Sequence, residues 1–237
     1  MREIILVTGC SGFLGSHMCS FLLKKNYKVF GIDNLLTGNK KNIESFFNNK
    51  NFHFKEHDVC DEIHIDSKVT KIIHLASPAS PKDYLKHPIK TLQTGSYGTE
   101  NILKLALTKK ATVLVASSSE VYGDPMKHPQ DENYFGNVNC TGPRAVYDEA
   151  KRYLEAITMA YHKKFNVDTK IARIFNTYGP NMKIDDGRAI PNFINQAINN
   201  NDITIYGNGE QTRSFCYVDD TILGLYKLLN SKYNSPF

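Results

Sequence analysis

The sequence predicts an α/β fold, a doubly wound parallel sheet followed by a partial, smaller C-terminal lobe. Three observations predict it. Short apolar segments recur between residues 4 and 175, each long enough for one buried strand. Segments with helical spacing separate them. Glycines and polar residues follow several of these strands, on the side of an open parallel sheet where ligands bind.

The first predicted strand, residues 4–7, runs directly into a glycine-rich turn and then a helix. Gly9 permits a tight turn, and Gly12 carries no side chain that would keep a pyrophosphate away. Gly15 lets the helix pack closely on the strand, and the free N–H groups at the start of that helix face the phosphates. The spacing G-x-x-G-x-x-G therefore predicts a dinucleotide loop, although an ordinary strand-to-helix turn can carry the same glycines.

The second predicted strand, residues 27–32, ends at Asp33, about 20 residues beyond the glycine loop. A carboxylate there accepts hydrogen bonds from a ribose and repels the 2′-phosphate of NADP, so we expect NAD as the cofactor. The third strand, residues 51–56, is followed by Asp58 and Val59. We expect this pair beside the adenine, although Asp58 could instead cap a helix.

The remaining pattern completes the expected sheet and then becomes more mixed. Further strands are predicted at residues 69–76, 111–116 and 167–175, and helices at 92–107 and from Pro143 onward, after a Pro-, Asn- and Gly-rich loop at 124–142. The tail predicts helices at 190–198 and 219–229 and short strands at 203–206 and 213–218. We therefore expect residues 1–178 to form the nucleotide-binding domain and residues 179–237 to form part of a substrate-binding lobe.

Composition limits the class of protein. The net charge is +5, but no dense basic run with interleaved aromatic residues is present, so we expect a lysine-rich surface rather than nucleic acid binding. No apolar run approaches a membrane span, and the first strand begins at about residue 3, which leaves no room for a signal peptide. The five cysteines lack C-x-x-C spacing. We expect a cytoplasmic protein with reduced thiols and no metal site.

Tyr147 and Lys151 are four residues apart, so they share one face of the predicted helix. The pKa of a free tyrosine is about 10, too high for a base at neutral pH, and a nearby ammonium lowers it. Tyr147 would then take a proton from a substrate hydroxyl while hydride leaves the same carbon for NAD. Lys151 would also hold the cofactor ribose. The Y-x-x-x-K spacing is common by chance, and it indicates a catalytic pair only because an NAD loop precedes it.

Polar residues follow the fifth predicted strand. Ser118 or Ser119 would lie at its carboxyl end, within reach of the same substrate hydroxyl. Glu120 adds a carboxylate beside that site, or else pairs with a surface lysine.

Longer motifs resemble those of one enzyme family. They lie at residues 8–17, 74–81, 119–125, 142–144, 147–152, 172–180, 185–188 and 206–215. The chain resembles the extended short-chain dehydrogenases/reductases of the NAD-dependent epimerase/dehydratase family that act on sugar nucleotides. Within them it most resembles the UDP-glucuronate decarboxylases, also called UDP-xylose synthases.

The resemblance implies a Rossmann-type NAD-binding domain, the catalytic residues Tyr147, Lys151, Ser118 and Glu120, and two further sets of site residues. Those implied around NAD, besides Tyr147 and Lys151, are Gly9, Ser11, Gly12, Phe13, Leu14, Asp33, Asn34, Thr37, Gly38, Asp58, Val59, Leu75, Ala76, Ser77, Ser117 and Thr177. Those implied around the UDP-sugar are Ser119, Asn176, Arg188, Tyr206, Gln211 and Arg213.

The implied reaction converts UDP-glucuronate to UDP-xylose. NAD oxidises C4 with Tyr147 as the base, and the resulting ketone is β to the C5 carboxylate. Loss of CO₂ then leaves an enolate, C5 is reprotonated, and NADH returns hydride to C4. Members of the family usually continue for several tens of residues beyond this sequence, so the second lobe looks truncated.

Other functions stay open at this point. A 4,6-dehydratase or a 4-epimerase uses the same scaffold, although residues 119–121 lack the Asp-Glu pair usual in dehydratases. A non-catalytic NAD-binding protein or an inactive fragment is the alternative of a different class. The nucleotide sugar and the final reduction also stay open. The resemblance further implies a homodimer that associates through the helices at 92–107 and around Tyr147.

Overall fold

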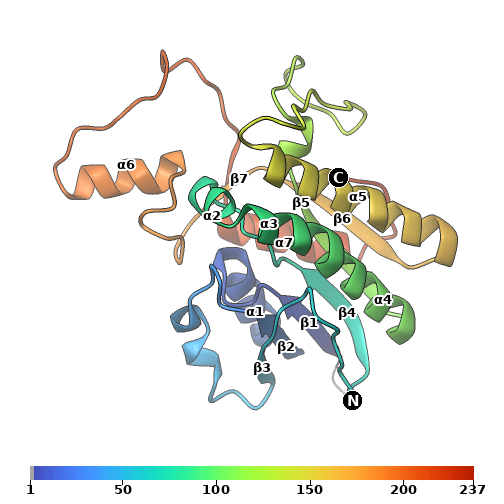
Figure 1. The fold of residues 1–237 in the computed structure, drawn as a ribbon. Coiled ribbons are helices and arrows are strands. Elements are labelled where there is room, and N and C mark those ends of the chain that lie inside the picture. The colour runs from blue at the N-terminus through green and yellow to red at the C-terminus, as the bar shows by residue number, and fades with distance from the viewer. Residues whose placement is uncertain (1–2) are drawn as a thin grey trace.

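The computed structural model describes residues 3–237, and its centre is a six-stranded parallel sheet with the strand order β3–β2–β1–β4–β5–β6 (Figure 1). The strands are β1 (Ile4–Thr8), β2 (Lys28–Asp33), β3 (Phe52–Glu56), β4 (Val69–His74), β5 (Thr112–Ser118) and β6 (Thr169–Ile174). This order is that of a Rossmann-type doubly wound sheet, so the predicted fold class is confirmed.

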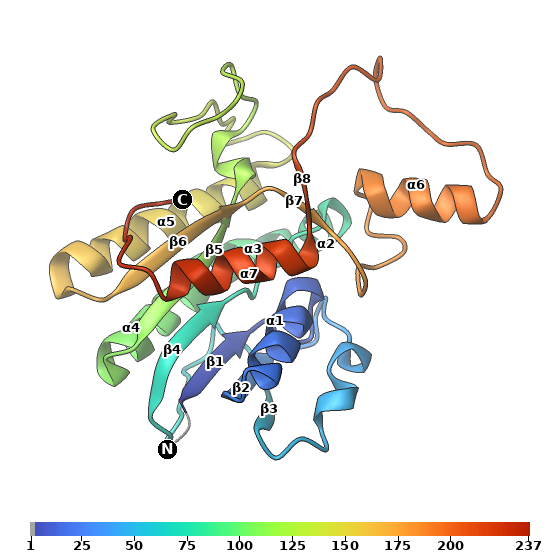
Figure 2. The ribbon, with the colours of Figure 1, turned by 180° about the vertical axis from the view of Figure 1, so that it is seen from behind.

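Helices cover both faces of the sheet (Figure 1, Figure 2). One face packs against α1 (Phe13–Lys24) and α7 (Val218–Leu229), and the other against α4 (Thr99–Lys109) and α5 (Ala145–Phe165). Alternate residues along a strand point to opposite faces of the sheet and pack in the two hydrophobic cores. In β1, Ile5 belongs to the first core and Leu6 to the second, as expected for a sheet buried on both faces.

Short helices complete the first part of the chain. They are the 3₁₀ turns η1 (Lys40–Asn42), η2 (Glu44–Phe46) and η4 (Ser119–Tyr122) and the α-helices α2 (Pro81–Lys86) and α3 (Pro88–Gln93). The helix predicted at 92–107 is interrupted by the π-helical segment η3 (Thr94–Gly98) between α3 and α4. Here the backbone approaches α5 closely, because a Cβ atom on Gly95 would lie 2.8 Å from the Cβ of Ala150.

The C-terminal part differs most from the prediction. The strand predicted at 203–206 is wrong, because Ile203 and Ile205 are exposed and have no sheet to pack against. The strand predicted at 213–218 shortens to β8 (Phe215–Tyr217), which pairs in parallel with β7 (Asn176–Tyr178). The predicted helix at 190–198 is confirmed as α6 (Ala189–Ile198), which stands away from the main body (Figure 1).

The segment after α6 returns to the sheet domain. Helix α7 buries Ile222 and Leu225 in the core that α1 shares. The N–H of Phe237 donates to the carbonyl of Ile171 (3.0 Å), and its own carbonyl accepts from the N–H of Arg173 (2.7 Å). The predicted division at residue 178 stays a prediction, but α7 and the residues after it lie with the sheet. Over residues 3–237 no helix is long and apolar enough to cross a membrane.

Candidate active site

A cleft of about 1810 Å³ opens at the carboxyl ends of the central strands. It lies where β1 and β4 are neighbours and the winding direction of the sheet reverses, the usual ligand site of this architecture. Pockets for drug-sized ligands measure about 300–1,000 Å³, so this cleft has room for more than one such ligand. A second, small cavity adjoins it beside the ends of β2 and β3.

The glycine loop has the geometry that its spacing predicts. Gly9 has a φ of +69°, a conformation that favours glycine, and its N–H donates to the carbonyl of Ile32 (2.8 Å). A Cβ atom on Gly15 would lie only 1.9 Å from the carbonyl oxygen of Gly9. The start of α1 therefore presses directly on the turn, and a side chain at position 15 would separate the two.

Asp33 is buried at the end of β2 and faces the glycine loop. Its Oδ2 accepts from the N–H of Ser11 (3.0 Å), and its Oδ1 accepts from the N–H of Leu35 (2.8 Å). A carboxylate oxygen can accept two hydrogen bonds, so each oxygen keeps capacity for a ribose hydroxyl. Gly38 belongs to the same corner, because a Cβ atom there would lie 2.1 Å from the Ser11 hydroxyl.

The loop also leaves donors unsatisfied, which tests its fit to a dinucleotide. The buried hydroxyl of Ser11 has no hydrogen-bond partner among residues 3–237. Helix α1 begins after Gly12 without a side-chain cap, so its first N–H groups are free to bind an anion. An orphaned hydroxyl and an uncapped helix N-terminus in one cleft fit a pyrophosphate.

Tyr147 and Lys151 reach the cleft from the first turns of α5. Both side chains are buried, with 7% and 4% of their surface exposed. The Lys151 ammonium donates to the carbonyl of Ala116 (2.7 Å) and lies 5.5 Å from the centre of the Tyr147 ring. The Ser118 hydroxyl, at the end of β5, lies within hydrogen-bonding reach of the Tyr147 hydroxyl. The structure thus brings these three predicted residues together.

Burial dominates the electrostatics of this pair. It raises the pKa of Tyr147, while the hydrogen bond with Ser118 and the charge of Arg188 act in the opposite direction. Burial also lowers the pKa of Lys151 to about 8, against the attraction of Glu155. Burial therefore outweighs the lowering of the Tyr147 pKa that was expected from Lys151, and the lowering influences identified are Ser118 and Arg188.

Tyr84 is a site residue that the sequence analysis missed. Its ring, on α2, stacks on the ring of Tyr147 with centroids 5.0 Å apart and planes inclined by 14°. Helix α2 begins after Ser80, whose hydroxyl accepts from the N–H of Asp83 (3.1 Å). A serine followed by proline is a helix-start signal, so the sequence did contain the information that this loop leads into a helix.

Glu120, on η4, lines the cleft and forms an ion pair with Arg144. The alternative interpretation expected Glu120 to pair with a surface lysine, but the partner is Arg144. Asp148 lies beside Tyr147 on the same side of α5, and its buried Oδ1 has no hydrogen-bond partner in the described part of the chain. Burial raises the pKa of Asp148, and the nearby Arg144 opposes this.

Most residues predicted around the cofactor line one of the two cavities. The main cleft is lined by Gly9, Ser11, Gly12, Phe13, Leu14, Thr37, Leu75, Ser77, Ser117 and Thr177. The small cavity is lined by Asp33, Asn34, Gly38, Val59 and Ala76. Asp58 lies outside both. Burial alone would raise its pKa, but hydrogen bonds from Lys90 (2.7 Å) and Asn34 (2.9 Å) lower it to about 2. Asp58 therefore holds Asn34, which lines the small cavity, and its place beside the adenine stays a prediction.

The residues predicted around the nucleotide sugar divide in the same way. Ser119, Asn176, Arg188, Gln211 and Arg213 line the main cleft. Arg188 pairs there with Asp186, and its Nη2 donates to Oδ2 over 2.8 Å. Tyr206 is 79% exposed and lies outside the cleft, because the strand predicted to carry it does not form.

Comparison with known proteins decides the family. The model of the NAD dependent epimerase/dehydratase family matches residues 5–236. The chain belongs to this family.

Within the epimerase/dehydratase family, the chain is similar to decarboxylases. It is 50% identical over 235 residues to UDP-glucuronic acid decarboxylase 1 of Xenopus tropicalis, and this match covers 99% of the chain and 55% of that protein. It is 49% identical over 233 residues to UDP-glucuronic acid decarboxylase 4 of Arabidopsis thaliana, and this match covers 98% of the chain and 52% of that protein. The chain thus spans little more than half the length of these curated relatives.

Solved structures of the epimerase/dehydratase family share the fold. The UDP-glucuronic acid 4-epimerase of Bacillus cereus, solved with UDP-glucuronic acid and NAD, superposes with a TM-score of 0.83 and 30% identity. The match covers 98% of the chain and 75% of that protein.

Proposed function

We propose that the chain is an NAD-dependent decarboxylase that converts UDP-glucuronate to UDP-xylose. The observation that carries the proposal is the identity of about half of all residues, over nearly the whole chain, with UDP-glucuronic acid decarboxylases. The cleft adds chemical support, because Tyr147, Lys151, Ser118 and Glu120 line it together. The 4-epimerase solved with UDP-glucuronic acid, at 30% identity, supports the same substrate.

The cofactor site of this proposal is the glycine loop with the end of β2. Ser11 and the first N–H groups of α1 would hold the pyrophosphate, and Asp33 would accept from the adenosine ribose. Lys151 would hold the nicotinamide ribose. When bound, NAD supplies an acceptor and then a donor of hydride for C4 of the sugar.

The proton chemistry at C4 belongs to Tyr147 and Ser118. The positive nicotinamide ring of bound NAD would favour the phenolate form of Tyr147, against the burial that raises its pKa. This phenolate would take the proton of the C4 hydroxyl, and Ser118 would hold the same oxygen by a hydrogen bond. The C4 ketone then allows CO₂ to leave C5, because the electron pair of the broken bond passes into an enolate whose oxygen is at C4. The protonated Tyr147 donates a hydrogen bond to that oxygen. Glu120 is the carboxylate available for proton exchange with the reacting sugar.

Two arginines line the cleft where we expect the diphosphate. Arg188 and Arg213 each offer a planar fork of donors that matches phosphate oxygens. Arg188 binds Asp186 in the structure, so the diphosphate would compete with this carboxylate for the same guanidinium. Asn176 and Gln211 contribute neutral donors, and the role of Tyr206 stays a prediction.

Product analysis tests the proposal. The purified chain is incubated with UDP-glucuronate and NAD, and nucleotide sugars and CO₂ are measured by mass spectrometry. We expect UDP-xylose and CO₂, and we expect Tyr147→Phe to lower the rate by about 10²-fold or more, as loss of a general base does. Tyr161→Phe is the matched control, because this tyrosine lies on the same helix outside the cleft and should keep full activity.

Other products would contradict the proposal in different ways. UDP-galacturonate without CO₂ would identify a 4-epimerase. A UDP-4-keto-pentose that accumulates would show decarboxylation without the final reduction. No product, with NAD bound, would favour the non-catalytic alternative.

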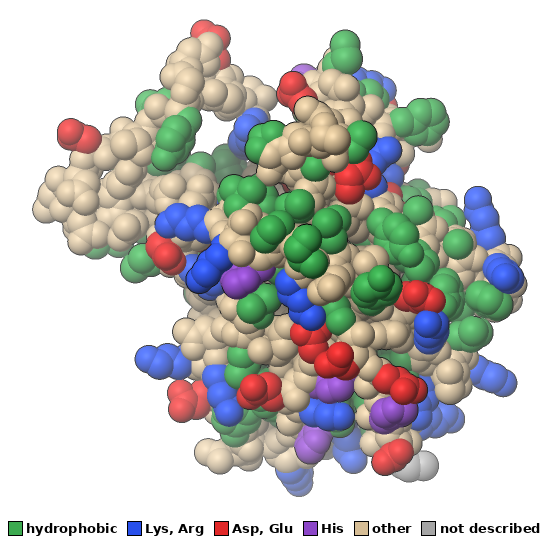
Figure 3. Space-filling view, viewed as in Figure 1, with side chains coloured by type: hydrophobic (Ala, Val, Ile, Leu, Met, Phe, Trp, Pro, Cys, Tyr) green, Lys and Arg blue, Asp and Glu red, His purple; other side chains and the backbone are tan. Residues whose placement is uncertain are grey.

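As part of the same proposal, the protein works as a homodimer in the cytoplasm. Large apolar side chains are exposed on the face that carries η3, α4 and α5, where Figure 3 shows hydrophobic side chains gathered: Tyr97, Leu107, Tyr153 and Phe165. Burial of this face against a second copy would remove it from water. The five cysteines are free thiols, which a reducing compartment favours. Sedimentation analysis of the purified chain measures the oligomeric state.

A further inference from the structure

The loop at 124–142 forms one wall of the cleft with its two ends. Residues 124, 125 and 128–130 line the cleft from one end, and residues 137–139 and 142 line it from the other. The middle of the loop, residues 131–136, does not contribute to the lining. Whatever holds this middle segment therefore fixes the wall from behind.

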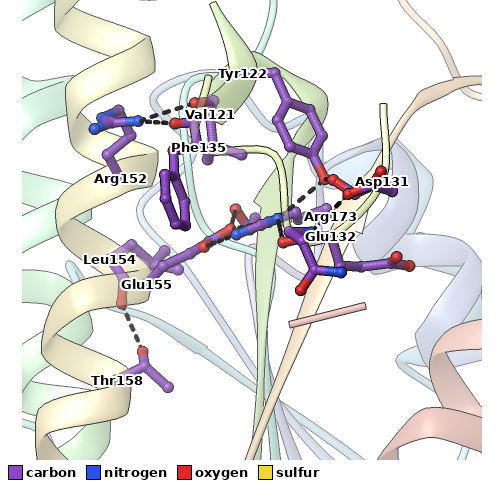
Figure 4. A network of polar contacts seen from close by, with 12 residues as sticks. Val121, Tyr122, Asp131, Glu132, Phe135, Arg152, Leu154, Glu155, Thr158 and Arg173 are labelled. Carbon is purple, nitrogen blue, oxygen red and sulfur yellow. Dashed lines mark hydrogen bonds and ion pairs between the residues drawn. The ribbon is translucent and has the colours of Figure 1, made fainter. Parts of the chain in front are cut away.

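Arg173, on β6, holds the middle of the loop. Its Nη1 donates to the carbonyl of Glu132 (3.1 Å) and to the hydroxyl of Tyr122 (3.0 Å), which in turn donates to the carbonyl of Asp131 (3.1 Å) (Figure 4). The guanidinium also lies over the Tyr122 ring, 5.1 Å from its centre. One side chain of the sheet thus binds the loop backbone at Glu132 directly and at Asp131 through Tyr122.

Arg152, on α5, holds the next part of the same segment. Its Nη1 donates to the carbonyls of Val121 (3.2 Å) and Phe135 (3.1 Å), so it ties the end of η4 to the loop (Figure 4). Neither Arg152 nor Arg173 lines the cleft. Both act on its wall from outside.

Glu155 connects this anchor to the catalytic helix. It lies one turn beyond Lys151 on α5 and binds Arg173 through both carboxylate oxygens (2.9 and 2.8 Å). Its Oε1 also accepts from the hydroxyl of Ser117 (2.5 Å), the residue before Ser118. The pair is largely buried, and a fork-to-fork contact of this kind fixes direction as well as distance. The loop, the end of β5 and α5 are therefore joined through one carboxylate.

We propose that Arg173, oriented by Glu155, and Arg152 are positioning residues for substrate: they hold the loop at 124–142 as a fixed wall on the sugar side of the cleft. Their loss should weaken binding of the nucleotide sugar more than binding of NAD, because the glycine loop shares none of these contacts and Ser117 is the residue predicted around NAD that bonds to Glu155. The part of this inference that concerns substrate rests on the proposed function. The part that concerns the loop does not.

Arg173→Lys in the full chain tests the inference. A lysine keeps the charge but cannot reach Glu155, Tyr122 and Glu132 together. We expect amide hydrogen exchange in residues 131–136 to speed up and KM for UDP-glucuronate to rise, each about tenfold for loss of a charge-assisted hydrogen bond. We expect kcat and the Kd of NAD to change less than about twofold. Arg152→Lys should act in the same direction.

Glu3→Gln is the matched control. It breaks the half-buried pair of Glu3 with Lys71 (3.0 Å), which lies at the opposite end of the sheet from the cleft. We expect it to leave exchange in the loop and KM at wild-type values. Unchanged loop exchange in Arg173→Lys would overturn the inference, as would an equal change in Glu3→Gln.

Hydrogen exchange and NAD binding separate this inference from the proposed function, because neither needs turnover. If the wild-type chain forms no product, the proposed function fails, and the exchange in Arg173→Lys still decides whether Arg173 holds the loop. Faster exchange without a change in KM would overturn the assignment as substrate-positioning residues.

Discussion

Lys151 is the residue at which function and stability conflict most directly. Its ammonium is almost fully buried, and the carbonyl of Ala116 is its hydrogen-bond acceptor. Burial lowers its pKa from an ordinary value of 10.5 to about 8. Between these two pH values the unfolded chain holds the proton more tightly than the folded chain, so the stability contributed at this site rises with pH. At neutral pH the folded protein therefore carries the full penalty of a buried charge.

Lys151→Met should consequently be more stable than the wild type at pH 7. The pKa shift corresponds to about 3 kcal/mol, and loss of the hydrogen bond to Ala116 offsets about half of it. We expect a gain of about 1–2 kcal/mol at pH 7 that shrinks as the pH rises from 8 to 10, together with loss of activity. Urea unfolding at several pH values measures the difference, and a gain that does not change with pH would contradict the buried ammonium.

At the residue scale the sequence predicted the chemical groups better than their surroundings. Tyr147, Lys151 and Ser118 follow from helical spacing and from the end of a predicted strand. Tyr84 and Arg144 do not, because they come from other segments and meet the site only after the chain has folded. The pKa of Tyr147 could not be predicted either, since it depends on how deeply the ring is buried.

At the scale of elements, α1 and the glycine loop depend on each other. The loop can turn because Gly9 has a positive φ, and α1 can begin where it does because Gly15 has no side chain. The N-terminus of α1 then faces the cleft with free N–H groups.

Gly15→Ala should therefore damage the cofactor site through the position of a helix. The new Cβ would lie 1.9 Å from the carbonyl oxygen of Gly9, so α1 must move away from the loop. We expect a loss of about 1–3 kcal/mol of stability, typical of overpacking, and a marked loss of NAD affinity by calorimetry.

Gly224→Ala is the control for this substitution. Gly224 lies within α7, and a methyl group there would meet no other atom within 4 Å. Alanine at this position should stabilise the helix by about 0.5–1 kcal/mol without affecting NAD. Equal effects of the two substitutions on NAD affinity would show that the close approach at position 15 has no role in binding.

The sequence also predicted long buried elements better than short exposed ones. Strands such as β1 and β5 have continuous apolar segments, and each of the six strands of the sheet lies within a few residues of its predicted position. The pairing of β7 with β8 joins segments of three residues that are far apart in sequence, for which local pattern carries no signal. Residues 203–206 alternate like a strand, but no neighbouring strand receives them.

At the scale of the whole molecule, the strand order creates the cleft. Because β1 lies next to β4, the glycine loop, the segment after β4 and the end of β5 meet at one edge of the sheet. Helix α5 adds Tyr147 and Lys151, and the loop at 124–142 closes one side. Helix α6 stands out from the main body (Figure 2), and residues 210–215, which follow it in the chain, return to line the cleft.

The proposed chemistry has C4 oxidised and reduced at one site, and it replaces the carboxylate at C5 with a proton from solvent. The reaction is therefore run in D₂O with UDP-glucuronate and NAD, and the product is examined by nuclear magnetic resonance. We expect UDP-xylose with deuterium at C5 and with the original hydrogen retained at C4. Deuterium at C4, or a product that keeps its carboxylate, would contradict decarboxylation through a 4-keto intermediate in this cleft.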